Sequence, residues 1–139
     1  GFDAVPGRVN SIAPRKRSVH TLNPVIATKD GNLRWVYASP GGISQTITGT
    51  QMLVNLVDRQ QSPAEAVRDP RWAIDRIGNT LVEPSVAPEV LNELNAAGIE
   101  ARYETDTYLF GSVNLVQYDS DRTVSAVGDI RRESCALAI

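Results

Sequence analysis

The strongest local constraint on this 139-residue chain is a pair of strand-forming runs joined by an Asp-Gly turn. The first run covers residues 24–28, the second covers residues 33–38, and Asp30-Gly31 lies between them. β-branched and aromatic side chains favour strands, and Asp-Gly is typical of the tight turn in a β-hairpin. The sequence therefore predicts a hairpin over residues 24–38, which leads into a sharp turn at Ser39-Pro40-Gly41-Gly42.

A helix is predicted after this turn, because mostly apolar residues recur at intervals of three and four. They define one helical face, made of Ile43, Ile47, Thr50, Val54 and Val57. Further apolar residues lie beside this face, namely Met52, Leu53 and Leu56. We therefore expect the helix to be buried on more than one side.

Two shorter helices are predicted from their end signals. The first begins at Ser62-Pro63, with Ser62 as the cap and Glu65 closing a capping box, and it ends at Asp69-Pro70. The second begins near Pro88 and ends at Gly98, where a left-handed cap is expected. Its inward residues are expected to be Val90, Leu91 and Leu94.

The remaining segments predict further strands and a second hairpin. Short strands are expected at residues 80–83 and 99–103, and a hairpin is expected from strands 112–118 and 123–127 around the loop 119–122. Residues 1–22 show no period and predict an irregular lead-in. Hairpins favour antiparallel pairing, so we predict a single α+β domain over residues 1–139, with helices on the sheet faces.

Composition narrows the classes of function. The net charge is −2 and the hydrophobic share is 42%, as in an ordinary soluble domain. The basic run Arg15-Lys16-Arg17 is short, so we expect a solvated loop and no nucleic-acid partner. Apolar runs are too short for a membrane span. With one His and one Cys, we expect no metal site and no cofactor, and we expect Cys135 to be packed rather than catalytic.

The most unusual motif is Ser39-Pro40-Gly41-Gly42, which stands between a predicted strand and a predicted helix. Two glycines let a backbone approach a bound group closely, and their N–H groups stand at the positive end of the helix dipole. Such an arrangement can stabilise a developing oxyanion. A turn that only needs positive φ angles is the alternative, and the pattern by itself leaves both open.

The order of the motifs resembles the γ-glutamyltranspeptidases. Residues 16–24 are similar to that family's segment K-R-P-L-S-S-M-S-P, and Ser39-Pro40-Gly41-Gly42 stands in matching register after Asp30-Gly31. Later matches follow in order: Gln51-Met52, Asn55, Ala66, Pro70-Arg71, Val82-Glu83, Gly98, Gly111-Ser112-Val113 and Asp129-Ile130-Arg131-Arg132. The resemblance covers nearly the whole chain from Pro6 onward.

The resemblance implies an αββα sandwich of the N-terminal-nucleophile hydrolase type. A precursor cleaves itself, and a threonine at the new N-terminus of the small subunit attacks an amide and forms an acyl-enzyme. The resemblance also assigns oxyanion contacts to Gly41 and Gly42. It places His20 and Thr21 where the family has the serine pair that binds the donor's carboxylate. The partners implied are a small amide substrate and the large subunit of the same precursor.

Two departures from the family pattern shape the expectations. In the family the nucleophilic threonine lies several dozen residues before the position of Pro6, so we expect residues 1–139 to be the C-terminal part of a small subunit, inactive alone. Sheets that pair with other segments should then leave an apolar edge or face open. The pair His20-Thr21 in place of two serines is closer to related acylases. Glutathione-like γ-glutamyl amides, other small acyl amides and a non-catalytic module therefore stay open, as does the compartment.

Overall fold

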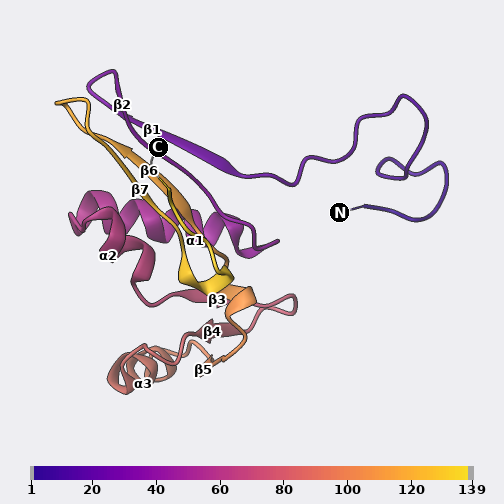
Figure 1. Cartoon of the computed structure of the whole chain (residues 1–139). Coiled ribbons are helices and arrows are strands. Elements are labelled where there is room, and N and C mark those ends of the chain that lie inside the picture. Colours follow the sequence, from indigo (N-terminus) through magenta and orange to yellow (C-terminus); the bar gives the residue numbers. More distant parts are fainter. Residues whose placement is uncertain (1, 138–139) are drawn as a thin grey trace.

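Seven strands form two separate sheets in the computed structural model, which describes residues 2–137 (Figure 1). The larger sheet has the order β1-β2-β6-β7, with strands Pro24–Lys29, Asn32–Ala38, Asn114–Tyr118 and Val124–Val127. The smaller sheet has the order β3-β4-β5, with strands Trp72–Ile74, Thr80–Val82 and Ala101–Tyr103. The fold is thus a mixed helix and strand arrangement built on two sheets.

Both predicted hairpins are confirmed. Strands β1 and β2 pair antiparallel out to Lys29 and Asn32, and the turn residues Asp30 and Gly31 have φ angles of 51° and 78°. Positive φ at both turn positions suits the right-handed twist of the strands. Strands β6 and β7 form the second hairpin, and β2 pairs with β6, so the two hairpins share one antiparallel sheet.

The predicted helices are also present. Helix α1 covers Ser44–Leu53 and continues as the π-helical turn η1 over Val54–Asp58. Helix α2 covers Pro63–Arg68 and has the full capping box between Ser62 and Glu65. Helix α3 covers Pro88–Ala96, and Gly98 follows with a φ of 83°. Two 3-10 turns, η2 at Thr107–Phe110 and η3 at Ile130–Arg132, complete the elements.

The buried face predicted for α1 is wrong. Ile43, Val54 and Val57 of that face are 55%, 40% and 52% exposed, and the buried positions belong to another face, made of Ser44, Thr48, Gly49, Met52, Asn55 and Leu56. This face packs against β2, where the hydroxyl of Tyr37 donates a hydrogen bond of 2.8 Å to the carbonyl of Gly49 and Tyr37 shares a core with Met52 and Leu56. Burial also raises the pKa of Tyr37 to about 12.

The smaller sheet departs from expectation in two ways. Strand β3 was not predicted, and β4 and β5 pair parallel rather than antiparallel. Helix α3 is the crossover between them, which is the kind of connection that parallel strands require. The inward face predicted for α3 is only partly formed, because Val90 is 45% exposed while Leu91 and Leu94 are half-buried. Helix α3 lies at the outer side of the small sheet, away from the larger one (Figure 1).

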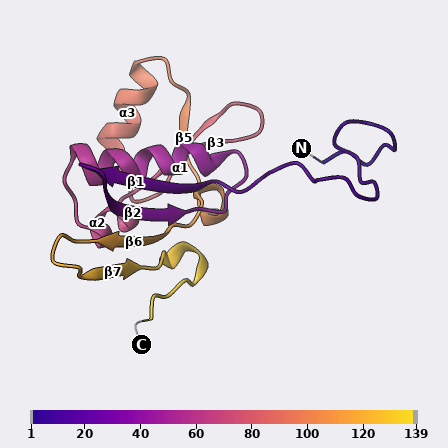
Figure 2. The same cartoon turned by 90° about the horizontal axis from the view of Figure 1, so that it is seen from above.

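The main core lies between the larger sheet and helices α1 and α2. Its buried members are Tyr37, Met52, Leu56, Ala66, Val67, Val113 and Leu115, and Trp35 packs against them. A smaller core joins Ala73, Leu81 and Phe110. The lead-in before β1 forms an isolated bridge between Asp3 and Ser11 and runs away from the body (Figures 1 and 2). Because the main core lies between them and the larger sheet, helices α1 and α2 cover one face of that sheet.

Candidate oxyanion site and the groove beside it

The turn Ser39–Gly42 connects the end of β2 to the start of α1. Gly42 has a φ of 57°, in the left-handed region that favours glycine. The N–H groups of Gly41 and Gly42 donate no hydrogen bond to any residue between 2 and 137. Both donors therefore stand free at the N-terminal end of α1, where the helix dipole adds partial positive charge.

Hydrogen bonds hold this turn and helix α1 against the segment before β6. The N–H of Ser112 donates to Oγ of Ser39 at 3.1 Å, and Oγ1 of Thr48 donates to the carbonyl of Phe110 at 3.1 Å. A Cβ on Gly111 would lie 2.6 Å from Oγ of Ser39 and 3.0 Å from the carbonyl oxygen of Pro40. Gly111 therefore permits a backbone approach that fixes where the two free N–H groups point.

A groove of about 660 Å³ opens directly beside the two glycines. Its lining comes from the start of α1, the β3–β4 loop, η2 and η3, and consists of Gly41, Gly42, Ile43, Ser44, Ile74, Asp75, Arg76, Ile77, Tyr108, Leu109 and Arg132. Four segments distant in sequence thus surround one space that the free N–H groups adjoin.

The β3–β4 loop, which forms one wall, is held by Asp75. One carboxylate oxygen of Asp75 accepts the N–H groups of Ile77 and Asn79 at 3.0 and 2.9 Å, and the other accepts Nδ2 of Asn79 at 2.7 Å. Desolvation raises the pKa of Asp75, but these hydrogen bonds and the charge of Arg102 outweigh it and hold the pKa below its usual value. The Asp75 carboxylate is therefore ionised, and both of its oxygens already accept hydrogen bonds from its own loop.

The opposite wall carries Tyr108 and Arg132. A terminal nitrogen of Arg132 donates to the carbonyl of Tyr108 at 2.9 Å, and the guanidinium stands 4.4 Å from the centre of the Tyr108 ring. A guanidinium over an aromatic face gains a cation–π attraction. The two contacts together fix the direction of the Arg132 side chain.

A buried charge network includes Arg131, the neighbour of Arg132 in η3. Arg71 is 1% exposed and pairs with Asp129 at 2.7 Å, while Arg131 pairs with Glu83 through two contacts of 2.5 and 2.6 Å. Asp129 also accepts the N–H of Val113 at 2.8 Å. The network joins η3 to the segments that follow α2 and β4 and to the segment that precedes β6.

The sequence motifs contain the members of this network but do not indicate how they pair. Arg71, Glu83, Asp129 and Arg131 all fall in motifs that matched the resemblance, but their mutual pairing could not be read from spacings of 12 to 60 residues. Sequence reasoning also missed Tyr108 and Arg76. A solvated arginine and an exposed aromatic have no local pattern that distinguishes them.

The structure places His20 and Thr21 in the extended segment before β1, and both are exposed. Because Pro24 pairs with Ala38, this segment leaves the sheet at the same end as the Ser39–Gly42 turn. Neither residue belongs to the lining of the groove beside Gly41 and Gly42. Their role in binding a donor carboxylate stays a prediction.

Other sequence expectations have different outcomes. Cys135 is exposed, so its predicted packing is wrong, because the chain after η3 lies outside the two cores. Residues 2–137 contain no group of three or more metal-ligating side chains. Nor does any helix among them have the length and apolarity needed to cross a membrane.

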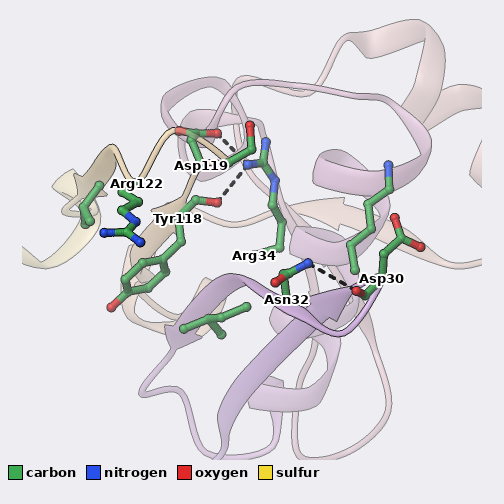
Figure 3. Close-up of a pocket in the computed structure, with 10 residues that line it drawn as sticks. Asp30, Asn32, Arg34, Tyr118, Asp119 and Arg122 are labelled. Carbon is green, nitrogen blue, oxygen red and sulfur yellow. Dashed lines mark hydrogen bonds and ion pairs between the residues drawn. The ribbon is translucent and has the colours of Figure 1, made fainter.

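A second hollow lies at the far end of the larger sheet, between the two hairpin loops (Figure 3). Arg34 reaches across it to the carboxylate of Asp119 at 2.5 Å and to the carbonyl of Tyr118 at 2.8 Å. The guanidinium of Arg34 is thereby satisfied within the chain. The hollow is remote from the two glycines, since α1 begins at the other end of the sheet (Figure 1).

Comparison with known proteins shows which family this chain belongs to. The family model described as gamma-glutamyltranspeptidase matches residues 1–139. The Acylase ACY 1 proenzyme of Pseudomonas sp. (strain V22) is 31% identical over 99% of this chain and 24% of its own length. The Glutathione hydrolase proenzyme of Bacillus subtilis (strain 168) is 28% identical over 99% of this chain and 23% of its own length. The chain thus spans about a quarter of the length of these curated relatives.

Solved structures agree on the fold. The gamma-glutamyltranspeptidase from Pseudomonas nitroreducens complexed with L-DON superposes with a TM-score of 0.77 and 22% identity, over 97% of this chain and 70% of that one. Cephalosporin acylase from Bacillus halodurans superposes with a TM-score of 0.79 and 25% identity, over 94% of this chain and 24% of that one. The chain belongs to the γ-glutamyltranspeptidase family.

Proposed function

We propose that residues 1–139 are the C-terminal part of the small subunit of an amide hydrolase or acyltransferase. In this proposal the acyl group passes through an acyl-enzyme on a threonine outside residues 1–139, after a precursor has cleaved itself. Gly41 and Gly42 donate to the oxyanion that develops on the attacked carbonyl. The relatives at 31% and 28% identity are named proenzymes, which supports a processed precursor.

One observation carries the catalytic part of the proposal. Two consecutive backbone N–H groups, at Gly41 and Gly42, lack any partner within residues 2–137, and both adjoin a groove at a helix N-terminus. Preorganised donors of this kind stabilise negative charge without rearrangement, and loss of one costs roughly 100- to 1,000-fold in kcat.

The sandwich architecture is part of the same proposal. Residues Ile26, Val36, Val116 and Ala126 pair across all four strands of the larger sheet, in a row that alternates with the core row containing Tyr37 and Leu115. The row therefore faces away from α1 and α2, and Ile26 is 69% exposed. A sheet that is apolar on both faces is typical of one covered on both. We propose that a second sheet, from the rest of the precursor, covers this face in an αββα sandwich and that a large subunit is the partner.

The acyl donor is proposed to be a γ-glutamyl amide such as glutathione. A relative named glutathione hydrolase supports this choice, and Thr21 retains a hydroxyl where the family has a serine. The second candidate is an acylase for another small acyl amide. It is favoured by His20, which replaces the other serine, and by the relatives named acylase at 31% and 30% identity.

The test uses the complete protein that contains this chain. Intact mass and N-terminal sequencing of each mature chain should find one that begins with threonine and contains these residues. Turnover is then measured with γ-glutamyl and glutaryl 4-nitroanilides, which separate the two acyl candidates. A stable, folded protein that is not processed and hydrolyses neither would mean that the fold serves a non-catalytic module.

The oxyanion role has its own matched pair of variants. Replacing the Gly41–Gly42 amide by an ester removes the N–H of Gly42 and leaves its φ free, while Gly42→Ala keeps the N–H, and a Cβ at Gly42 meets no atom within 4 Å. We expect the ester to lower kcat roughly 100- to 1,000-fold and Gly42→Ala to lower it far less. Thermal unfolding of both variants checks the fold. Equal losses in the two variants would show that the turn conformation, and not the donor, is what matters.

A further inference from the structure

We propose that a groove between helices α1 and α3 is the docking site for a helix of the large subunit, and that this partner helix is amphipathic with basic side chains beside its apolar face. The docking rests on the proposed function, in which a large subunit is the partner, and it names the kind of segment that the subunit contributes. It concerns how the subunits assemble and not the amide chemistry.

The groove has a volume of about 590 Å³ and separates α1 and its continuation η1 from α3. Strands β3 and β4 lie between the two helices and form its floor (Figure 1). Four large apolar side chains, Val54, Trp72, Val90 and Ile99, line the groove, and each is between 40% and 45% exposed. Large apolar side chains that gather in one exposed hollow mark an interaction site, and tryptophan is enriched among the residues that dominate binding. The lining is therefore suited to the apolar side chains of a protein partner.

The floor of the groove favours a helix over a strand as the occupant. The side-chain amide of Gln51, on α1, donates to the carbonyl of Trp72 at 3.0 Å and accepts its N–H at 3.1 Å. Both backbone groups of Trp72 are thereby satisfied, so this position offers nothing to the backbone of an added strand. A helix satisfies its own backbone and binds through apolar side chains three and four positions apart. Two flanking helices with a floor between them form the shape that such a helix fills.

The charge on the rim specifies what the partner helix carries. Glu89 and Glu93 are exposed and lie one helical turn apart on α3, each directly before a residue that lines the groove. Within residues 2–137 neither forms an ion pair, and α3 has no basic residue. Like charges at this spacing repel, so a partner that brings cations to both is favoured. Arg59 and Asp69, across the groove, pair with each other at 2.8 Å and leave the acidic stripe uncompensated.

The length of chain outside residues 1–139 indicates the large subunit as the source of this helix. The chain spans about a quarter of its curated relatives but 70% of the superposed chain of the Pseudomonas nitroreducens protein, so most of the remaining length of such a protein lies outside that chain. A second copy of residues 1–139 is a poorer fit, because no α-helix among residues 2–137 carries a basic stripe. Helix α1 has no charged residue, α2 has one arginine, and the charges of α3 are acidic.

Photo-crosslinking in the complete, processed protein tests which segment fills the groove. The photoreactive residue p-benzoylphenylalanine replaces Val90 in one variant. In the matched control it replaces Asn92, which is exposed and points to the opposite side of α3. Illumination should join the Val90 variant to the large subunit, and tandem mass spectrometry should place the joined residue on a helix with Lys or Arg beside its apolar face. The Asn92 variant should give little of this product.

Charge reversal tests the acidic stripe. Glu89→Lys combined with Glu93→Lys should raise the dissociation constant of the two subunits at least about tenfold, because like charges then face each other across the interface. Asn92→Lys, on the opposite side of the same helix, should leave the constant within about twofold. Subunit separation in urea, followed by size-exclusion chromatography, gives the comparison, and circular dichroism checks that the variants are folded.

The docking is overturned if the Val90 variant cross-links no more than the Asn92 variant, since the groove is then open to water. A cross-link to a second copy of residues 1–139, to another part of the small subunit or to a separate protein overturns it as well. Equal effects of the double reversal and of Asn92→Lys would refute the basic character of the partner helix. Cross-linking requires no turnover, so a processed protein that hydrolyses no amide would refute the proposed catalysis and leave the Val90 result to decide the docking.

Discussion

Asp129 is the residue on which the buried charge of this chain converges. It is 0% exposed, pairs with Arg71 at 2.7 Å and with Arg131 at 3.3 Å, and accepts the N–H groups of Val113 and Arg131. Burial raises the pKa of Asp129, but the two guanidinium groups and the backbone donors outweigh burial and hold the pKa below its usual 3.8. One carboxylate therefore links the segment before β6 to two arginines that are distant from it in sequence or in the next turn.

Replacement of Asp129 by asparagine should destabilise the protein by about 3–5 kcal/mol, because Arg71 is left as a buried charge without its partner. The folded pKa of Asp129 lies below the unfolded one. Its stabilisation is therefore fully present above about pH 3.8 and is lost as the pH falls through the lower folded value. Denaturant unfolding from neutral to acid pH measures both effects.

The control for this prediction is Asp58→Asn, at an exposed acid outside the network. It should change the free energy of unfolding by less than about 0.5 kcal/mol at every pH. If Asp129→Asn unfolds at the same denaturant concentration as the natural protein at neutral pH, the network contributes specificity of packing and not stability.

At the scale of elements, the Ser39–Gly42 turn and the segment before β6 behave as one unit. Ser39, Thr48 and Ser112 supply the hydrogen bonds, and Gly111 supplies the space. The turn connects the end of a hairpin to the start of a helix. The positions of the two N–H groups therefore depend on how both elements pack. Precision at the candidate site therefore depends on contacts across about 70 residues of sequence.

Gly111→Ala should disturb the site more than the fold. The added Cβ would lie 2.6 Å from Oγ of Ser39 and 3.0 Å from the carbonyl oxygen of Pro40, and Gly111 has a φ of 73°. The turn must shift, so we expect amide turnover by the complete protein to fall at least about tenfold, as a displacement near 1 Å can cause.

The matched change is Gly31→Ala, in the β1–β2 turn, which also has positive φ, at 78°, but meets no atom within 4 Å. It should cost only the backbone strain of a left-handed alanine, about 1 kcal/mol, and leave turnover nearly intact. Equal loss of turnover in the two variants would mean that strain alone, and not the displaced turn, explains the effect.

At the scale of the whole molecule, the larger sheet has one face that the described residues cover only in part: Val36 and Val116 are half-buried and line a hollow together with Cys135, Ala136 and Leu137. Helices α1 and α2 cover the side of the larger sheet that holds Tyr37 and Leu115 (Figure 2). The row from Ile26 to Ala126 lies on the other side, with Val124 exposed beside it. The outer edge of β1 also lacks a strand partner among residues 2–137. Both features fit the proposed sandwich, in which further segments of the precursor complete the sheet.

Ile26→Lys tests this proposal in the complete protein. A lysine between two packed sheets would be buried without a partner, so we expect a loss of several kcal/mol or a failure of the precursor to mature. Ser120→Lys, in the exposed β6–β7 loop, should be tolerated. Unfolding free energy and the fraction of processed precursor are the measurements. Tolerance of Ile26→Lys would mean that this face stays open to water.

The sequence by itself determined the local elements. The Asp30-Gly31 turn, the capping box from Ser62 to Glu65 and the cap at Gly98 were readable because each depends on residues a few positions apart. Motif order likewise indicated the family and singled out Gly41 and Gly42. The turn and cap signals arise from backbone preferences and short-range hydrogen bonds. These depend on the local sequence alone and not on the rest of the fold.

Only the tertiary structure decided which surfaces meet. Helix α1 buries the face that carries Thr48 and Gly49 rather than its more apolar face. Gly49 accepts a hydrogen bond from Tyr37, and Thr48 donates one to Phe110. The tertiary structure also made β4 and β5 parallel through α3, and it brought Arg71 to Asp129 and Arg132 to the groove beside Gly41 and Gly42. These outcomes depend on packing and on the pairing of buried charges between distant segments, and no local pattern encodes which partner will fill a given space.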